Sequence, residues 1–473
     1  MTIAADRPTT TADSPPGPGS GSGRGRRNLL ELRPVAAVAR SRAYPGVLQW
    51  AAIAVFVVIV YQLLVGPQRA HDNLGTALTW VLWWPVIPIV FVLVGRFWCA
   101  VCPFGKLSDL VQRLVGVHRP VPGLLRRYGI WIIDAQFIAI TWADHVWGIV
   151  GSPWGTGILL LLLTTAVVAS GAFFQRRTFC RYLCFLGGLS GNYARTGMLA
   201  LRANQDVCAT CTARAVCYNG GEKAPACPLF EFPRTMDSAA NCNLCANCIK
   251  NCPNDALTLT WQPPTKELWF IRRPVLEHSF LATAIMGIVF IQNITMLGIW
   301  TNALDLLERS TGVTSYPVIF TAAFTVAIAV PTLLLALSSR IASPRTGEGT
   351  WRTFARYGYA LIPLDVAGHI AHNLFHLLAE GKAVVSTAVV AVGGTASPGS
   401  PALAPTGTIQ VLQYLVLALG VAGSACTAWR IARARQGDTG PTRWAALAPH
   451  LTVIAVLFAV NVVLFALPMT HRM

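Results

Sequence analysis

The distribution of apolar residues predicts a protein that crosses a membrane many times. A helix needs about 20 mostly apolar residues to span the hydrocarbon core of a bilayer. Nine stretches approach this length, and they lie near residues 48–66, 76–96, 128–148, 157–174, 278–300, 316–337, 354–378, 408–429 and 447–467. The pattern therefore predicts an all-α polytopic membrane protein with about nine transmembrane helices.

The polar stretches between these spans divide the chain into four regions. Residues 1–45 are rich in Pro, Gly, Ser, Thr and Arg, which favours a disordered basic arm. Residues 46–200 form a predicted four-helix transmembrane region, and residues 273–473 form a predicted five-helix region. Between them, residues 201–272 are long and polar enough for a small inserted α+β domain.

The charged residues predict how the chain is oriented. Only 12% of the residues are charged and 54% are hydrophobic, whereas a soluble domain carries about 25% charged residues. Lys and Arg gather in the loops at 96–127, 175–277, 338–353 and 430–446. This bias predicts a plasma-membrane protein with its amino terminus and the 201–272 domain in the cytoplasm. Membrane topology accounts for the net charge of +17, so we expect no nucleic-acid partner.

Cysteine spacing supplies the candidate chemistry. Of the thirteen cysteines, Cys426 stands alone in an apolar run and the others are closely grouped. The most compact run, C-N-L-C-A-N-C-I-K-N-C-P, begins at Cys242 and ends at Pro253. Its C-x2-C-x2-C-x3-C-P spacing is that of bacterial two-cluster ferredoxins, in which three thiolates hold one cluster and the fourth holds the other. The run therefore predicts a two-cluster ferredoxin-like domain.

A second, looser run supplies the partner ligands. It begins at Cys208, ends at Cys227-Pro228 and has insertions after its second and third cysteines. Cross-pairing the two runs predicts two [4Fe–4S] clusters. One takes Cys208, Cys211, Cys217 and Cys252, and the other takes Cys242, Cys245, Cys248 and Cys227. The alternative is one cluster together with a structural zinc, which also binds four cysteines.

Two further cysteine pairs follow predicted transmembrane helices. Cys99 and Cys102 come after the span at 76–96, and Cys180 and Cys184 come after the span at 157–174. Each pair has arginine before it and glycine shortly after it, and positive neighbours favour the thiolate that binds metal. If the two helices are neighbours, the four thiolates predict a third cluster or metal site at the membrane surface. Redox-active or inert thiols at helix ends are the alternative.

These motifs resemble those of the membrane polyferredoxins. That family includes the quinol-oxidising subunit of periplasmic nitrate reduction, the nitrous-oxide-reductase regulator and the cytochrome oxidase assembly ferredoxin. The resemblance covers roughly residues 50–270 and implies two C-x3-C-P motifs after transmembrane helices, followed by a cytoplasmic two-cluster domain. This chain departs from the pattern: two residues separate Cys99 from Cys102, Phe185 stands in place of proline, and the run from Cys208 is expanded.

The span at 354–378 carries a stripe of ionisable residues. Asp365, His369, His372 and His376 fall within an arc of roughly 60° on an α-helix. Ionisable groups inside a membrane usually line a cavity or a pathway. The stripe predicts a metal site for haem b, copper or zinc, with His145 of the span at 128–148 as a further candidate ligand. Quinone binding, proton relay and a hydrogen-bonded polar seam are the alternatives.

Together these features predict a membrane-bound iron–sulfur protein. We expect it to pass electrons between a cytoplasmic donor or the quinol pool and an acceptor in the membrane or on its outer side. A redox or metal-handling assembly factor and a redox-sensing regulator are the alternatives. Because the chain has no Walker-type loop and no flavin-binding glycine motif, an electron-transfer component is favoured over a complete enzyme. The expected partners are the lipid membrane, a redox protein or quinone, and further subunits.

Overall fold

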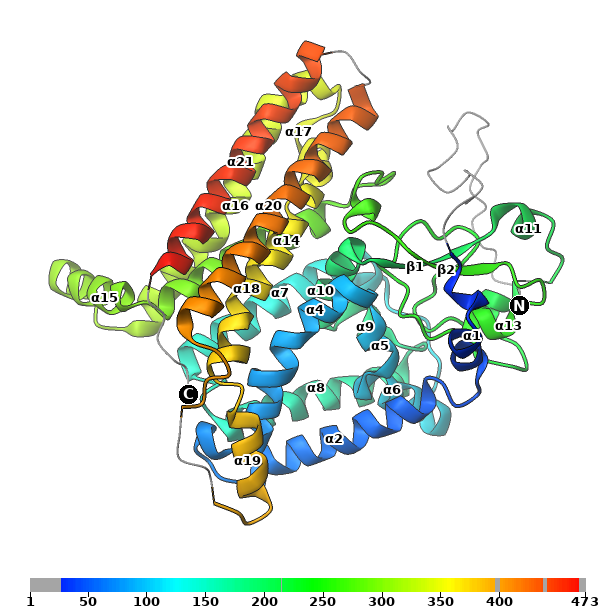
Figure 1. Cartoon of the computed structure of the whole chain (residues 1–473), viewed down its shortest axis with the longest axis horizontal. Coiled ribbons are helices and arrows are strands. Elements are labelled where there is room, and N and C mark those ends of the chain that lie inside the picture. Colours follow the sequence, from blue (N-terminus) through cyan, green and yellow to red (C-terminus); the bar gives the residue numbers. More distant parts are fainter. Residues whose placement is uncertain (1–26, 214, 396–399, 437–439, 468–473) are drawn as a thin grey trace.

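The computed structural model is mostly helical. Its described residues are 27–213, 215–395, 400–436 and 440–467. Four long helices of the second half pack side by side in one bundle (Figure 1): α14 (Leu276–Thr295), α16 (Tyr316–Thr346), α20 (Thr406–Gln436) and α21 (Gly440–Ala466). The short α15 (Gly298–Thr311) projects from this bundle. The cysteine-rich segment, residues 201–272, lies at the opposite side of the molecule.

Seven helices of the described chain are long and apolar enough to cross a membrane, or up to eight if a bent pair is one span. They are Gly46–Val65 (α2), Leu74–Val94, Pro153–Phe173 (α8), Leu276–Thr295, Tyr316–Thr346, Thr406–Ala434 and Arg443–Ala466. The bent pair joins α18 (Ile362–Ala379) to α19 (Ala383–Ala391) at 52°. The prediction of a helical, multi-span protein agrees with this result, whereas the predicted count of about nine spans does not.

Two predicted spans account for the difference. The span at 128–148 is α7 (Gly123–Trp147), which is long enough but carries Asp134 and Asp144 and is not among the apolar spans. The span at 354–378 is interrupted, because α17 (Thr350–Tyr357) ends before α18 begins. A short 3₁₀ turn, η6 (Gly358–Ala360), separates the two helices, and Pro363 stands in the first turn of α18, where a missing backbone N–H is tolerated.

The span Leu74–Val94 is irregular at its centre. It consists of α3 (Leu74–Thr76), a π-helical segment η3 (Ala77–Trp83) and α4 (Trp84–Val94). Pro85 and Pro88 have no backbone N–H, so the regular helical hydrogen-bond pattern cannot continue through them. The wide turns before Trp84 compensate for these missing donors.

The region 46–200 contains one local architecture twice. In each copy a long helix is followed by a helix of one turn and then by a third helix. The first copy is α4, α5 (Phe97–Val101) and α6 (Pro103–Val115), and the second is α8, α9 (Thr178–Tyr182) and α10 (Phe185–Tyr193). The long and short helices are joined through positive φ angles at Gly95 (62°) and Arg177 (55°). Since α6 packs on α8, the two copies interlock.

The cysteine-rich segment is closed by a small sheet. β1 (Leu199–Ala203) and β2 (Leu257–Trp261) pair antiparallel, with Leu199 opposite Trp261. Three short helices lie between them: α11 (Gln205–Ala209), α12 (Val216–Asn219) and α13 (Asn247–Asn251). The segment is therefore an α+β insertion between α10 and α14.

The residues just before the first span are folded onto this segment. α1 (Arg33–Arg40) is followed by Tyr44, whose O–H donates to the Leu244 carbonyl at 2.7 Å. Asn28 Oδ1 accepts from the Leu259 N–H at 3.0 Å. The predicted disorder of residues 1–45 is therefore wrong for residues 27–45, because their side chains join the small core of the cysteine-rich segment. Residues 1–26 lie outside the described residues.

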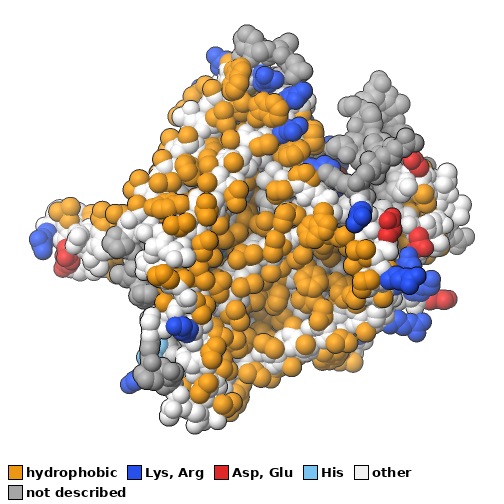
Figure 2. All heavy atoms as spheres, in the orientation of Figure 1, with side chains coloured by type: hydrophobic (Ala, Val, Ile, Leu, Met, Phe, Trp, Pro, Cys, Tyr) orange, Lys and Arg blue, Asp and Glu red, His pale blue; other side chains and the backbone are white. Residues whose placement is uncertain are grey.

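The surface agrees with a membrane protein. Figure 2 shows apolar side chains covering the face of the long helices, while Lys and Arg gather at the ends of helices and over the side with the cysteine-rich segment. Burying such a face in lipid removes its apolar surface from water, which supplies the driving force for membrane association. The long helices therefore form the part of the molecule suited to hydrocarbon.

Candidate iron–sulfur sites

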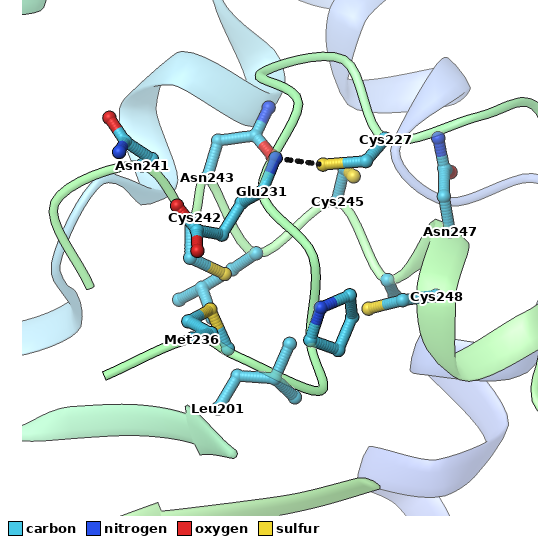
Figure 3. A pocket seen from close by; sticks show the side chains of 13 residues that line it. Leu201, Cys227, Glu231, Met236, Asn241, Cys242, Asn243, Cys245, Asn247 and Cys248 are labelled. Carbon is cyan, nitrogen blue, oxygen red and sulfur yellow. Dashed lines mark hydrogen bonds between the residues drawn. The ribbon is translucent and has the colours of Figure 1, made fainter. Parts of the chain in front are cut away.

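Four cysteines of the cysteine-rich segment line one pocket, and we call them the buried set. They are Cys227, Cys242, Cys245 and Cys248. Figure 3 shows their side chains around the pocket, which Leu201 and Met236 close from the side of the sheet. Cys227 reaches the pocket from the loop after α12. Cys242 and Cys245 come from the turns leading into α13, and Cys248 lies in the first turn of α13. The pocket therefore joins parts of both cysteine runs.

Left-handed backbone shapes the turns of the buried set. Leu244 (φ 57°) and Ala246 (φ 61°) both adopt this conformation. The turns direct backbone N–H groups of Leu244 and Asn247 toward the sulfur atoms of Cys242 and Cys245. Successive inward N–H groups form an anion-binding concavity. The loop therefore suits negatively charged sulfur.

Burial and hydrogen bonding act in opposite directions on these thiols. Burial raises the pKa of Cys242 to about 12 and that of Cys245 to about 11, although the inward N–H groups lower both. Cys227 Sγ accepts a hydrogen bond from the Glu231 N–H at 3.3 Å. The thiolates thus need a positive partner that compensates for their burial, as a metal centre does.

A second group of four cysteines, the peripheral set, lies nearer the surface. It consists of Cys208, Cys211, Cys217 and Cys252. Burial raises the pKa of Cys208, and repulsion from Cys252 and Cys211 adds to the effect. Burial also raises the pKa of Cys217, and repulsion from Cys252 and Cys208 adds to the effect. Cys211 is exposed and accepts from Asn254 Nδ2 at 3.3 Å, while Cys252 accepts from the Ala256 N–H at 3.4 Å.

The two copies of the membrane architecture bring together a third group, the membrane set. It consists of Cys99, Cys102, Cys180 and Cys184. Burial raises the pKa of Cys102 to about 12, and repulsion from Cys180 and Cys99 adds to this. Burial, followed by repulsion from Cys180 and Cys102, raises the pKa of Cys184. Cys99 Sγ also lies 3.7 Å from Ser190 Oγ of the other copy.

Two helix amino termini point at the membrane set. Cys102 is the N-cap residue of α6, and Cys184 is the N-cap residue of α10. Backbone N–H groups of Phe104 and Gly105 act on Cys102, and that of Gly187 acts on Cys184; each lowers the pKa of its thiol. A helix amino terminus carries positive partial charge, which favours a thiolate. The same helix position therefore supports one cysteine in each copy.

The three sets lie in a row. The peripheral set lies close to the buried set, because electrostatic repulsion from Cys217 contributes to the raised pKa of Cys248. The buried set also contacts the membrane set, because Asn243 Nδ2 donates to the Cys99 carbonyl at 3.4 Å. The buried set therefore lies between the peripheral set and the membrane set.

The chemistry of each set fits a four-cysteine iron–sulfur cluster. Within the described residues, no three His, Cys, Asp or Glu side chains are arranged to share one metal ion. A zinc ion would require that arrangement, because all four sulfur atoms bind it at about 2.3 Å. A [4Fe–4S] cluster needs its four cysteine sulfur atoms to be further apart, since each cysteine binds a different iron atom. Sulfur donors with N–H groups aimed at them therefore fit the cluster.

The histidine stripe lies within the protein, and each imidazole has a polar neighbour. His369 Nδ1 is 3.0 Å from the Tyr193 hydroxyl, and His372 Nδ1 is 2.8 Å from Asn293 Oδ1. His376 Nδ1 lies 3.4 Å from Glu380 Oε2. These contacts fit a hydrogen-bonded polar seam, and haem, copper or quinone at the stripe stays a prediction.

The remaining two candidate ligands, Asp365 of the stripe and His145 of α7, have different surroundings. Asp365 is 1% exposed, and neither of its carboxylate oxygens has a hydrogen-bond partner among the described residues. His145 stacks on Phe320 of α16, with ring centroids 4.9 Å apart, and its Nδ1 lies 2.9 Å from the Thr141 carbonyl. His145 is thus held by α7 and α16.

Two arginines beside the membrane set, predicted only as positive flanks, have specific partners in the structure. Arg177 forms a two-point ion pair with Asp109 of the first copy, and Arg96 donates to the Ala240 carbonyl. A repeated spacing offered the signal: arginine stands three residues before the first cysteine of each pair, and Gly105 or Gly187 stands three residues after the second.

Comparison with known proteins supports this chemistry. Residues 76–122 and 156–202 each match the 4Fe-4S binding domain family. The two matches contain the two cysteine pairs of the membrane set, and they correspond to the two copies of the local architecture. Two segments of the chain are therefore similar to a 4Fe-4S binding domain.

A relative from Escherichia coli (strain K12), YccM, is described as a proposed electron transport protein. It is 25% identical over 273 residues, which cover 52% of this chain and 72% of YccM. No solved structure matches the chain. The chain is thus similar in two segments to 4Fe-4S binding domains and, over about half of its length, to this relative, which agrees with the resemblance to ferredoxin-type membrane proteins that its cysteine motifs predicted.

Proposed function

We propose that this protein is a membrane-bound electron carrier with three [4Fe–4S] sites, one at each cysteine set. It exchanges electrons with a soluble partner or the quinol pool at one end and with an acceptor in or across the membrane at the other. The observation that carries the proposal is the row of sets, which runs from exposed Cys211 to Cys184 beside the long helices. A row of redox sites is what stepwise electron transfer requires.

The residues of the chain have separate tasks in this proposal. The cysteine thiolates hold the clusters, which when bound accept and release one electron at a time. The backbone N–H groups near Cys242, Cys245 and Cys102 stabilise negative charge on sulfur. Pocket residues such as Leu201 and Met236 keep water from the buried set. Hydrogen bonding and solvent exclusion together set the reduction potential.

The row continues toward the histidine helix through aromatic side chains. Phe185 follows Cys184 directly, and the Phe185 and Trp84 rings are 6.4 Å apart. Trp84 in turn lies 5.6 Å from the His369 ring. A bilayer core is about 30 Å thick, so sites at one surface cannot alone serve the other. We therefore favour α18 as the direction in which electrons enter or leave the membrane region.

The same proposal places the cysteine-rich segment in the cytoplasm. Lys and Arg dominate the loops on its side of the predicted topology, as expected for cytoplasmic loops. Reducing conditions there keep thiols available for metal binding rather than for disulfides. Labelling of single cysteines introduced into the loops at 338–353 and 430–446, in intact cells, tests this orientation.

The decisive experiment is cluster analysis of the full-length chain. After anaerobic purification in detergent, we expect about twelve irons per chain, four for each set. Reduction with dithionite should give electron paramagnetic resonance signals of interacting clusters. Cys102→Ser should remove about four of these irons. Cys426→Ser, at the isolated and exposed cysteine of α20, is the matched control and should change nothing.

The outcomes distinguish the proposed function from its rivals. Low iron with bound zinc after anaerobic reconstitution would overturn the electron-transfer proposal. Clusters that respond to oxidant but show no turnover with donor and quinone would favour a redox sensor. Copper or zinc retained at His369, His372 and His376, without turnover, would favour a metal-handling assembly factor.

A further inference from the structure

Two buried arginines occupy equivalent places in the two copies of the membrane architecture. Arg96 precedes Cys99 by three residues, and Arg177 precedes Cys180 by three residues. Their exposed fractions are only 5% and 4%. A buried guanidinium is costly unless its charge and its donors are compensated. The contacts of both side chains therefore matter.

Arg177 crosses from the second copy into the first. Its Nε and Nη2 donate to the Asp109 carboxylate at 2.9 and 2.6 Å, and Nη1 donates to the Cys99 carbonyl at 3.4 Å. Asp109 lies on α6. A two-point pair of this kind fixes the orientation of the planar guanidinium as well as its position.

Gly105 leaves the space that this crossing needs. A Cβ atom at Gly105 would lie 2.1 Å from Arg177 Nη1, which is far inside contact distance. The guanidinium cannot simply move away, because Asp109 holds its other side. In the other copy, a Cβ atom at Gly187 would lie 3.6 Å from Arg96 Nη2, so this glycine also faces the arginine of the opposite copy.

Arg96 connects the membrane set to the buried set. Its Nη1 donates to the Ala240 carbonyl at 2.6 Å, two residues before Cys242. Asn243, just after Cys242, donates to the Cys99 carbonyl, which also accepts from Arg177. One strip of backbone beside the buried set is therefore tied to Cys99 and to both arginines.

We propose that Arg96 and Arg177 are positioning residues that fix the membrane set against the buried set and raise the reduction potential at this junction. The inference rests on the proposed function, because it assumes clusters at both sets. Adding an electron makes a thiolate-bound cluster more negative, and a fixed positive charge in a poorly polarisable surrounding favours that state.

The two arginines should differ in how much they raise the reduction potential. Asp109 offsets much of the Arg177 charge. Within the described residues, Arg96 has no carboxylate partner and donates to a neutral carbonyl. The uncompensated charge of Arg96 should therefore influence the potential more than that of Arg177.

Redox titration of the detergent-purified full-length chain, followed by electron paramagnetic resonance, tests the proposal. For Arg96→Gln we expect at least a tenfold fall in the ratio of reduced to oxidised cluster at a fixed potential, which equals about 59 mV for a one-electron couple. Arg177→Gln should shift the ratio in the same direction but less. Arg113→Gln, at an exposed position of α6, is the control and should leave the ratio unchanged.

A change of sign separates an electrostatic effect from a loss of structure. Asp109→Asn removes the negative partner of Arg177, so the reduced fraction should rise rather than fall. Gly105→Ala should displace the Arg177 guanidinium and lower the reduced fraction without removing a charge, whereas Gly123→Ala, which meets open space, should not. Arg96→Lys should restore most of the potential that Arg96→Gln loses, because it restores the charge.

The outcomes also separate this inference from the proposed function. A wild-type chain without iron at the buried and membrane sets would overturn both. Iron-loaded Arg96→Gln and Arg177→Gln with unchanged potentials would overturn the inference alone. If the Gln variants lose iron, the Lys variants at the same positions decide the question. Lys variants that keep their iron and their reduction potential support the inference. Equal loss of iron in the Lys and Gln variants would overturn it.

Discussion

The buried set and the peripheral set each bring four cysteines together, but in different settings. In the buried set, Leu244 and Ala246 hold the turns in left-handed conformations and neighbouring residues such as Asn247 are packed inside. In the peripheral set, Cys211 is exposed and its hydrogen-bond donor is the side chain of Asn254. Under the proposed function, one segment would separate two tasks: contact with a partner at the peripheral set and delivery of electrons to the membrane set from the buried set.

The largest effect should come from breaking the buried set. In Cys245→Ser we expect loss of about four irons. We also expect loosening of the membrane set, because Asn243 in the same turn is hydrogen-bonded to the Cys99 carbonyl. Iron analysis and the spin coupling between remaining clusters would report both losses. Cys426→Ser serves as the control, and an intact membrane-set signal in Cys245→Ser would contradict the expected coupling.

Breaking the peripheral set should be more local. In Cys211→Ser we also expect loss of about four irons, but with the buried and membrane sets retained. Reduction by a soluble donor should slow at least tenfold, while reduction by small dithionite should persist. The measurement is stopped-flow absorbance with both reductants. Equal slowing with both would mean that the peripheral set is not the contact point for the donor.

Oxygen exposure should separate the two sets in time. Because Cys211 is exposed and the buried set lies in a pocket, the first phase of iron release into a chelator should contain about a third of the iron, one cluster of three. Mass spectrometry after thiol alkylation should find Cys211 modified before Cys245. Simultaneous modification of both would remove the distinction drawn between the sets.

The smallest effect should come from a single hydrogen bond. Asn254→Ala removes the donor to Cys211 Sγ, and hydrogen bonds to sulfur favour the reduced cluster. The potential of the peripheral cluster should fall by less than about 59 mV, a tenfold ratio, with the buried cluster unchanged. Gln205→Ala, at an exposed position of α11, is a control near the same site. A rise in potential would show that the donor has another role.

Spacing predicted the grouping of the cysteines because ligand sets are local. Cross-pairing of the two cysteine runs predicted two sets of ligands. In the structure Cys227, Cys242, Cys245 and Cys248 line one pocket and the other four cysteines interact with one another, and their role as cluster ligands stays a prediction. Long apolar runs such as Gly46–Val65 were equally clear, because their signal is carried by every residue. Local patterns therefore predicted most of the apolar spans and the candidate ligands.

Contacts between residues far apart in the sequence could not be predicted from local sequence patterns. The basic composition of residues 27–45 suggested disorder, yet Tyr44 and Asn28 hydrogen-bond to residues about two hundred positions away. The partnership of Arg177 with Asp109 likewise depends on how the two copies pack. α7 was predicted as a span from its length, although Asp134 and Asp144 make it more polar than the apolar spans.

The antiparallel pairing of β1 and β2 has an evolutionary consequence. Leu199 lies opposite Trp261, so the chain enters and leaves the cysteine-rich segment at neighbouring points. An insertion with adjacent ends can be gained, lost or exchanged without changing the separation of the helices on either side. Replacement of this cassette would therefore leave the paired membrane copies with Cys99 and Cys180 in place.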